Sequence, residues 1–277
     1  MHISIRKNLK KDKSARAGLV IFIILLLTAA IVPFFIKSPD VFSKTILTGP
    51  STSNILGTND LGQDIFSRLI FGLRTSIFVA VSAGLLATLL SVITGVTAGF
   101  SGGLVDEVIM RIIDAMLVIP SIIILILISA FIKPDLISLV VLIALFRWQG
   151  GARIIRGETL AIKQKIHIHS AKTFGAGKLY ILKRHIIPDL GNIIMASFLQ
   201  NARSAVFLEA GMAFIGISSL STISLGTIMH NALEFYYLPV WLWWLLPSGI
   251  MLSLVLVSFT LLSNLIEKVI DPRLKDA

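Results

Sequence analysis

Four amide-bearing or charged side chains interrupt a largely apolar stretch between residues 193 and 217, and they are the first candidates for a functional role. They are Gln200, Asn201, Arg203 and Glu209. A charge inside a membrane-spanning helix costs roughly 3 kcal/mol and usually faces protein or water. These residues therefore either line a polar pathway for a solute, or pair within the protein or with a partner subunit. Both interpretations remain open for Arg203.

The other reactive side chains do not form a pattern typical of a catalytic or metal site. His167 and His169 are two residues apart, so they do not share a face of a helix, and contact with a partner or solvent is favoured. Met229 and His230 fall in a predicted external loop. His230 could touch a metal-bearing substrate there, although packing of the loop is favoured. With no GxxxxGKS/T phosphate loop and no cysteine, we expect no catalytic residue, no bound cofactor and no metal.

The composition predicts an integral membrane protein. Of its 277 residues, 55% are hydrophobic and 14% are charged, and the mean hydropathy is +0.89. A span needs about 20 mostly apolar residues. Six segments fit or come close, namely 17–36, 76–100, 108–132, 136–146, 193–217 and 241–265. The expected fold is an all-α integral membrane protein with six transmembrane helices, kinked at Pro33, Pro120 and Pro247 because proline cannot continue the hydrogen-bond ladder.

The basic residues predict the orientation of these spans. The segment before the first span carries Arg6, Lys7, Lys10, Lys11, Lys13 and Arg16. Lys and Arg accumulate on the cytoplasmic side of membrane proteins, so residues 1–16 are expected in the cytoplasm, and six spans return the C-terminus there. The basic loop 151–188 then also falls inside. The same rule explains the net charge of +10. Binding of nucleic acid is not expected, because the sequence has no basic face with interleaved aromatic residues outside the spans.

Two short patterns concern contacts between the spans. Gly95 and Gly99 form a small-xxx-small face that allows close helix approach, and packing within the chain is favoured over a dimer contact. Arg111 and Asp114 are three residues apart near the start of the third span. These two side chains can pair with each other. An internal pair or a contact with a partner subunit is favoured over lining of a pathway.

The segment 56–74 is predicted to be an external amphipathic helix that lies along the membrane surface. Its apolar residues recur every four positions, at Leu61, Ile65, Leu69 and Leu73. Asp64 and Arg68 are four residues apart and can pair, and Thr58 or Asn59 could cap the helix. Interfacial packing is favoured, and docking or gating is the alternative.

A basic, only moderately apolar stretch from 159 to 188 separates the apolar halves of the chain. One helical face is predicted to carry Ile162, Ile166, Ser170 or Ala171, and Phe174. Gly175 and Gly177 are expected to end this helix, and Pro188 is expected to end a second short helix that starts at residue 178. The apolar stripe is too narrow for a span, which predicts docking into a groove of a cytosolic partner.

This stretch resembles the coupling loop of binding-protein-dependent ABC importer permeases. His169-Ser170-Ala171 stands where the family has Glu-Ala-Ala, and Gly175 and Pro188 follow at the family spacing. Histidine and serine thus replace the usual glutamate and first alanine. Either the matching ATPase groove differs in charge, or these two positions face away from it.

Further motifs resemble the dipeptide, oligopeptide and nickel permeases within that family. Residues 56–74 are similar to the signature LGTDxLGRDxxSRLxxGxR, from which Asn59 and Gln63 depart. Residues 106–121, 209–216 and 271–274 are similar to the third-span signature, the end of the fifth span and the C-terminal ending. The matches keep the family order from about Leu56 to Leu274, and they point to the second permease of a pair, the one with the short N-terminus.

The resemblance implies a type I ABC importer permease with its transmembrane domain over 17–277, core spans over 76–265 and a coupling helix in loop 151–188. The implied partners are a homologous permease in a heterodimer, two cytosolic ATPases that carry ATP and Mg, an extracytoplasmic solute-binding protein and membrane lipid. Such a subunit lies in the bacterial plasma membrane and is not an enzyme. It couples ATPase closure to alternating access for peptides or for nickel and metal chelates. The implied ATPase contacts are Ile162, Ile166, His169, Ser170, Ala171, Phe174, Gly175 and Pro188.

A six-helix ion channel or a secondary transporter without ATPase partners is the alternative. A channel would need a selectivity element between the last two spans, where Glu234 is the one acid. A secondary transporter usually carries an internal repeat, and none is convincing in this sequence.

Overall fold

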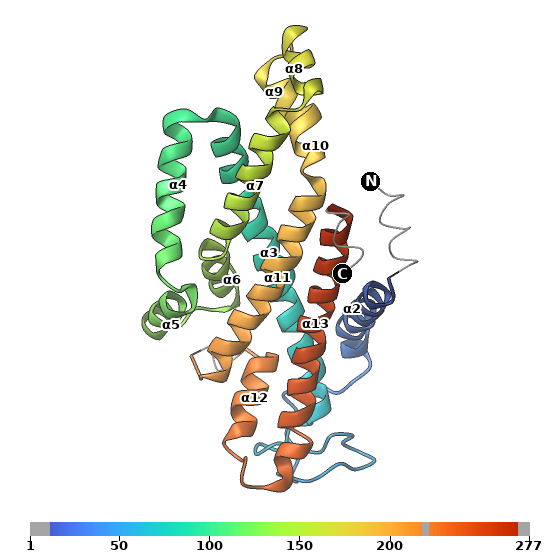
Figure 1. The fold of residues 1–277 in the computed structure, drawn as a ribbon. Helices are drawn as coiled ribbons and strands as arrows, with labels where there is room; N and C mark the ends of the chain where they lie inside the picture. Colours follow the sequence, from blue (N-terminus) through green and yellow to red (C-terminus); the bar gives the residue numbers. More distant parts are fainter. Residues whose placement is uncertain (1–11, 218–221, 271–277) are drawn as a thin grey trace.

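The computed structural model describes residues 12–217 and 222–270, and this part of the chain is helical. Figure 1 shows an elongated bundle with α8 and α9 projecting at one end and α12 toward the other. The bounds are α2 (Lys13–Ile31), α3 (Ile65–Ser101), α4 (Gly103–Val118), α5 (Ser121–Ile132), α6 (Leu136–Leu145), α7 (Trp148–Lys163), α8 (Ile166–Thr173), α9 (Lys178–Ile181), α10 (Ile187–Asp189), α11 (Gly191–Phe214), α12 (Leu225–Leu233) and α13 (Leu245–Ile270). The basic residues 6–11 and the motif 271–274 lie outside the described residues.

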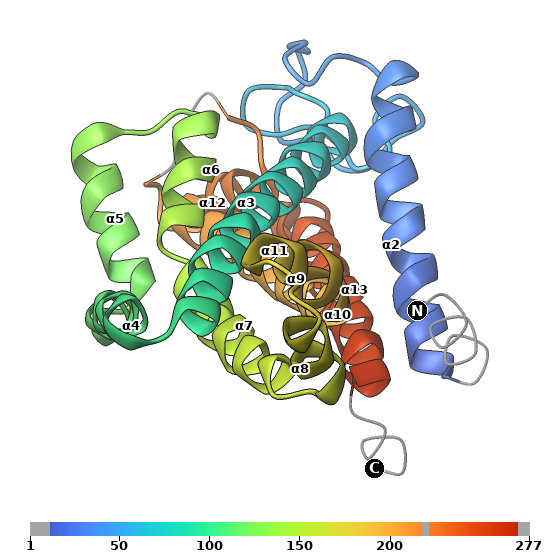
Figure 2. The ribbon, with the colours of Figure 1, turned by 90° about the horizontal axis from the view of Figure 1, so that it is seen from above.

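The long helix α3 forms the centre of the bundle together with α11 and α13, and Figure 2 shows α2 on one side of this centre and α4 and α5 on the other. Small residues let the helices approach closely. A Cβ added at Gly95 would lie 2.5 Å from the Ala152 carbonyl oxygen of α7, and one at Gly99 would lie 2.8 Å from Thr159 Cβ. The prediction that this glycine pair packs within the chain is therefore confirmed.

The prediction of a separate surface helix over 56–74 is wrong, because residues 56–64 form a loop and the helix that follows is part of α3. Residues 65–74 are the first turns of α3, and the helix begins after Asp64, whose carboxylate accepts a hydrogen bond from the Ser67 amide at 2.8 Å. Thr58 and Asn59 are buried in the loop before it and do not cap it. Arg68 donates to Gln63 Oε1 at 2.6 Å rather than pairing with Asp64. The four-residue repeat marks the buried side of α3, on which Leu69 and Leu73 lie.

The predicted third span, 108–132, is broken, whereas the predicted fourth span, 136–146, coincides with the short α6 and is followed by a bend. Helices α4 and α5 meet at Pro120 with a bend of 75°, far sharper than a kink within one helix, and the short α6 is followed by α7 at 42°. The first thirteen residues assigned to loop 151–188 thus belong to α7. Pro33 lies in the 3-10 turn Val32–Phe34 that follows α2, and Pro247 lies in the first turn of α13, where no helical hydrogen bond is lost.

Helices α2 and α13 pack side by side through a core that includes Leu25, Phe259 and Leu262. Lys268 Nζ donates to Asp12 Oδ2 at 2.8 Å, which joins the start of α2 to the end of α13. The Lys268 hydrogen bond and the hydrogen bonds from Ser14 and Ala15 hold the pKa of Asp12 well below its usual range. The start of α2 and the end of α13 are therefore tied together.

By length and composition, the described part holds three helices able to cross a membrane, or up to five if each bent pair is one span. The three are Lys13–Phe34, Ile65–Ser101 and Pro239–Lys268. Helix α11 is not among them, because Gln200, Asn201, Arg203 and Glu209 lower its hydropathy, although it runs through the centre of the bundle (Figure 2). The structure thus supports an all-helical membrane protein, while the count of six spans stays a prediction.

Candidate functional site

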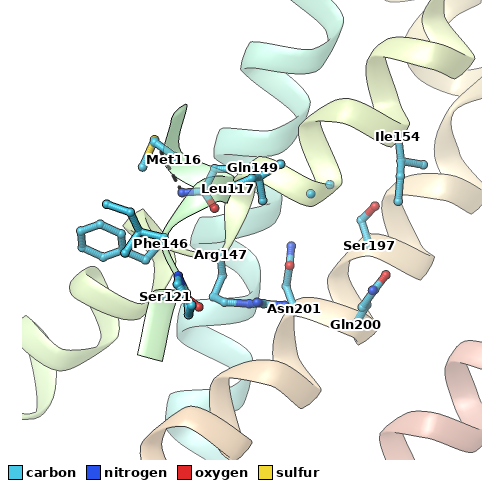
Figure 3. A pocket seen from close by; sticks show the side chains of 14 residues that line it. Met116, Leu117, Ser121, Phe146, Arg147, Gln149, Ile154, Ser197, Gln200 and Asn201 are labelled. Carbon is cyan, nitrogen blue, oxygen red and sulfur yellow. Dashed lines mark hydrogen bonds between the residues drawn. The ribbon is translucent and has the colours of Figure 1, made fainter. Parts of the chain in front are cut away.

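Both helix breaks and the polar part of α11 meet at one cavity of about 380 Å³ (Figure 3). Pro120 and Ser121 reach it from the α4–α5 break, and Arg147 and Gln149 reach it from the α6–α7 break. Proline at the first break removes a helical donor, and the turns on either side leave backbone groups that can face a polar space. From α11 the cavity is lined by Ser197, Gln200 and Asn201.

The candidate pathway residues of α11 divide between this cavity and other places. Gln200 is exposed, whereas Asn201 is buried and its Nδ2 donates to Thr88 Oγ1 of α3 at 3.1 Å. Arg203 lines a second cavity of about 480 Å³ next to the first, and its Nη1 donates to Thr260 Oγ1 of α13 at 3.3 Å. The structure therefore brings three of the four predicted side chains to two adjoining cavities.

Glu209 lies elsewhere, in a polar junction between three helices. It is 2% exposed, and Ser76 Oγ of α3 donates to its Oε2 at 3.3 Å. The same Ser76 hydroxyl accepts a hydrogen bond from the Leu225 amide at the start of α12, at 3.4 Å. This geometry matches the internal-pairing interpretation of a charged residue in a span better than the pathway interpretation.

Met229 and His230 are on α12, against the end of α11. The His230 ring nitrogen Nδ1 is hydrogen-bonded to the Phe214 carbonyl oxygen at 2.9 Å. Gly216, with a φ of +83°, passes so close that an added Cβ would lie 2.9 Å from the His230 ring. Met229 lines an apolar cavity with Leu245. These contacts agree with packing as the role of His230, and the described residues contain no group of three or more potential metal ligands.

The basic loop forms a small folded unit around seven buried residues, which are Val96, Ile155, Ile162, Ile168, Ile181, Ile186 and Leu190. The single stripe predicted from Ile162 to Phe174 is wrong, because α7 ends at Lys163 and α8 begins anew at Ile166. Ile162 is fully buried, whereas Ile166 is 84% exposed and Phe174 is 90% exposed. The apolar residues of this loop thus serve two purposes, an internal core and an exposed outer face.

The outer face of the loop, called here the loop tip, consists of Ile166, Phe174, Leu179 and Tyr180. His169 and Ser170 are exposed, and Ala171 is half-buried. Helix α8 ends at Thr173, and the chain turns at Gly175 as predicted. The φ of Gly175 is +81°, its amide donates to the Lys172 carbonyl, and the Ala176 amide donates to the Ala171 carbonyl at 3.0 Å.

Pro188 does not end a helix here, contrary to the sequence-based expectation. The chain stays helical from α9 into α11, and Pro188 lies in the first turn of α10. A proline ring clashes with the carbonyl four residues before it and lacks the amide proton that would bond to it. The π-helical turn Leu182–Ile186 relieves this, since the Ile187 amide reaches back to the Leu182 carbonyl instead.

Ion pairs that the sequence did not predict clamp α4 to α7. Arg156 bonds both oxygens of Asp106, and Arg153 bonds Asp114. The expected pair of Arg111 with Asp114 is therefore wrong; Arg111 pairs with Glu107 at 3.6 Å. Both clamps join residues about 40 to 50 positions apart, which no local spacing rule detects. Arg147 was also missed, although an arginine directly after the apolar run of α6 is a detectable signal.

An all-helical chain with a polar cavity between broken helices, and with a folded loop projecting from one end, has the form of a multi-pass membrane transport subunit. Residues 91–276 match the family of binding-protein-dependent transport system inner membrane components. Residues 4–50 match the N-terminal TM domain of oligopeptide transport permease C. The chain belongs to this family of inner-membrane transport components.

Curated relatives match along nearly the whole chain. The dipeptide transport system permease protein DppC of Bacillus subtilis is 33% identical over 97% of this chain and 85% of its own length. The oligopeptide transport system permease protein OppC of the same organism is 31% identical over 96% and 88%. The dipeptide permease DppC of Haemophilus influenzae is 30% identical over 96% and 92%.

The family determines the general role of the protein. It is an inner-membrane, multi-pass permease subunit of a binding-protein-dependent ABC transporter, and it is not itself the ATPase. A transporter of this kind implies an ATPase and a solute-binding protein as partners. The suspected resemblance to the permeases of dipeptide and oligopeptide transport is confirmed.

Proposed function

We propose that this chain forms half of the pathway of an ATP-driven peptide importer, paired with a homologous permease. Two cytosolic ATPases would bind ATP and Mg beneath the pair, and an extracytoplasmic binding protein would deliver the cargo. Peptides are preferred over nickel or metal chelates as cargo because the relatives reported above are named for dipeptide and oligopeptide transport. This class of substrate also suits the first cavity, whose wall carries the guanidinium group of Arg147 and the amide groups of Gln149, Gln200 and Asn201.

The observation that carries the coupling role is the loop tip. Ile166 and Phe174 are almost fully exposed on a unit whose own core is fully buried. Large apolar side chains held outward on a rigid base are typical of a surface that docks into a groove. The proposed ATPase contacts are Ile166, His169, Ser170, Ala171, Phe174 and Gly175. Ile162 and Pro188 would act indirectly, by holding the base of the loop.

The proposed topology has six spans, with α11 as the fifth, and both termini in the cytoplasm. The Asp12–Lys268 pair supports it, because it joins the start of α2 to the end of α13. Helix α13 also packs against α11. Helix α11 begins at Gly191, directly after the basic loop. The start of α2, the end of α13 and the loop would then share the cytoplasmic side, as the basic residues require.

The test is transport by the complete complex of both permeases, both ATPases and the binding protein in proteoliposomes. Uptake of labelled di- and oligopeptides is expected to depend on ATP, and uptake of ⁶³Ni²⁺ alone or as a chelate is expected to stay at background. ATP-dependent nickel uptake without peptide uptake would overturn the choice of cargo. Peptide uptake in the absence of the ATPases would overturn the coupling role and favour a secondary transporter.

A further inference from the structure

Two arginines from different parts of the chain line the second cavity. Arg147 lies at the break between α6 and α7, and Arg203 lies on α11. Both line the same cavity of about 480 Å³, together with Ser204 and Phe207. Arg147 also lines the neighbouring cavity of about 380 Å³, where Figure 3 shows it extending from the α6–α7 break toward Asn201.

Neutral groups hold these two guanidinium groups in place. Arg147 Nη2 donates to Ser204 Oγ at 2.9 Å, and Arg203 Nη1 donates to Thr260 Oγ1 at 3.3 Å. Within the part of the chain that the structure describes, Arg147 Nε is buried without a hydrogen-bond partner, and neither arginine is within ion-pair distance of an acid. In contrast, Arg153 and Arg156 on α7, six and nine residues after Arg147, each pair with an aspartate.

A partly buried cation without a counter-charge inside a bundle of membrane helices is costly and requires an anion or water beside it. We propose that Arg147 and Arg203 form a transient binding site for the carboxylate group of the peptide cargo as it passes through the subunit, an inference that rests on the peptide import proposed above. A guanidinium group offers paired donors that fit a carboxylate. Hydroxyl partners orient both arginines without neutralising them, which leaves their charge available to a mobile anion.

The surroundings favour a small cargo over a fixed acidic side chain of the partner permease. The arginines line hollows whose volumes fall within the range of small-molecule pockets, about 300 to 1,000 Å³. Gln200 and Asn201 add amide groups to the adjoining cavity, where they can bond to the peptide backbone. A permanent ion pair across the subunit boundary would instead hold the pathway closed, whereas conduction requires binding that is weak enough to release.

The test compares one peptide with a free C-terminal carboxylate and its C-terminal amide in the complete transporter. Initial uptake is measured for wild type, Arg147→Gln and Arg203→Gln. The binding protein can itself prefer one peptide, but it is identical in every arm, so its preference cancels when the free-to-amide uptake ratios of variant and wild type are compared. Each substitution is expected to lower uptake of the free peptide about tenfold, in line with losing a charge-assisted hydrogen bond, and to leave amide uptake nearly unchanged.

Two control variants keep the outcomes distinct. Arg147→Lys retains the charge and is expected to restore most of the free-to-amide ratio. Arg111→Gln removes an exposed arginine outside both cavities and is expected to leave the ratio unchanged. Equal losses for both peptides would overturn the proposal and assign Arg147 to packing or to a contact with the partner permease. Wild-type transport of neither peptide would overturn the proposed cargo as well, which separates that failure from this one.

Discussion

Replacing Phe174 by alanine should uncouple the transporter while leaving this subunit intact. The side chain is 90% exposed, so its truncation removes almost no contact within the chain, and the stability of the isolated subunit should change by less than about 0.5 kcal/mol. If the ring inserts into an ATPase groove, it buries about 150 to 250 Å² there. At about 25 cal/mol per Å², complete burial is worth about 4 to 6 kcal/mol, and half of that burial about 2 to 3 kcal/mol.

A loss of 2 kcal/mol weakens ATPase binding about 30-fold. The assay therefore measures the affinity of the ATPase pair for the purified permease pair, and ATP hydrolysis stimulated by loaded binding protein. Phe35→Ala is the matched control, because Phe35 is also a largely exposed phenylalanine, at 83%. It lies after the last turn of α2 and is not part of the basic loop. Phe35→Ala is expected to retain wild-type affinity and stimulation.

A second control separates docking from folding of the loop. Ile168 is fully buried on α8, the helix that carries Ile166 of the loop tip and precedes Phe174. Ile168→Ala should therefore destabilise the loop by about 2 to 5 kcal/mol and lower the thermal midpoint as well as coupling. Phe174→Ala should lower coupling alone. Wild-type ATPase affinity in Phe174→Ala, or a fall in its thermal midpoint equal to that of Ile168→Ala, would refute the docking role of this side chain.

Three other changes test the supports of the fold. Gly175→Val should lower transport-linked ATPase activity with membrane insertion intact, because a φ of +81° costs a residue with a side chain about 1 to 2 kcal/mol. Gly175→Asn should be better tolerated, and normal uptake in the valine variant would contradict this prediction. Asp106→Asn and Arg156→Gln should each cost about 2 kcal/mol in detergent unfolding, and the double variant less than their sum, whereas additive losses would exclude a coupled pair. The pKa of Asp12 is lowered in the folded state, so its contribution to stability is present above about pH 4 and is lost as the pH falls below that value. The free energy of unfolding of Asp12→Asn should therefore be lower than that of wild type by up to about 1 kcal/mol at pH 7, and the two should converge in acid.

Local patterns in the sequence predicted the features that depend on neighbouring residues. The apolar runs located most helices, the glycine pair at Gly95 and Gly99 was assigned correctly to internal packing, and Gly175 ended its helix as expected. The same reasoning failed where a residue far away decides the structure. A four-residue repeat cannot distinguish a helix on a membrane surface from the first turns of α3, because both bury one side. The partner of Asp106 is likewise invisible until α4 and α7 are placed together.

Pro188 shows a different limit. A proline after a short basic helix normally predicts the end of that helix, and the sequence offers no sign that a π-helical turn will absorb the missing hydrogen bond. The consequence is large, because the chain then runs helically from Lys178 in the loop to Phe214 at the far end of α11. A break at Pro188 would have separated the loop from the cavity, whereas the π-helical turn keeps the two connected.

This continuity explains how a movement of the loop can reach the cavity. Helix α7 begins beside Arg147 and Gln149 in the cavity wall and ends beside Ile162 in the loop core, and α11 runs from Leu190 in that same core to Gln200 in the same wall. The buried cluster fastens the loop to both helices at once, so a force on the loop tip displaces both walls together. The helix breaks at Pro120 and Phe146 lie where such a displacement can be absorbed as a change of angle, because no continuous ladder of helical hydrogen bonds crosses them. In the proposed coupling, a push on the loop would therefore open or close the cavity by changing the angles at these two breaks.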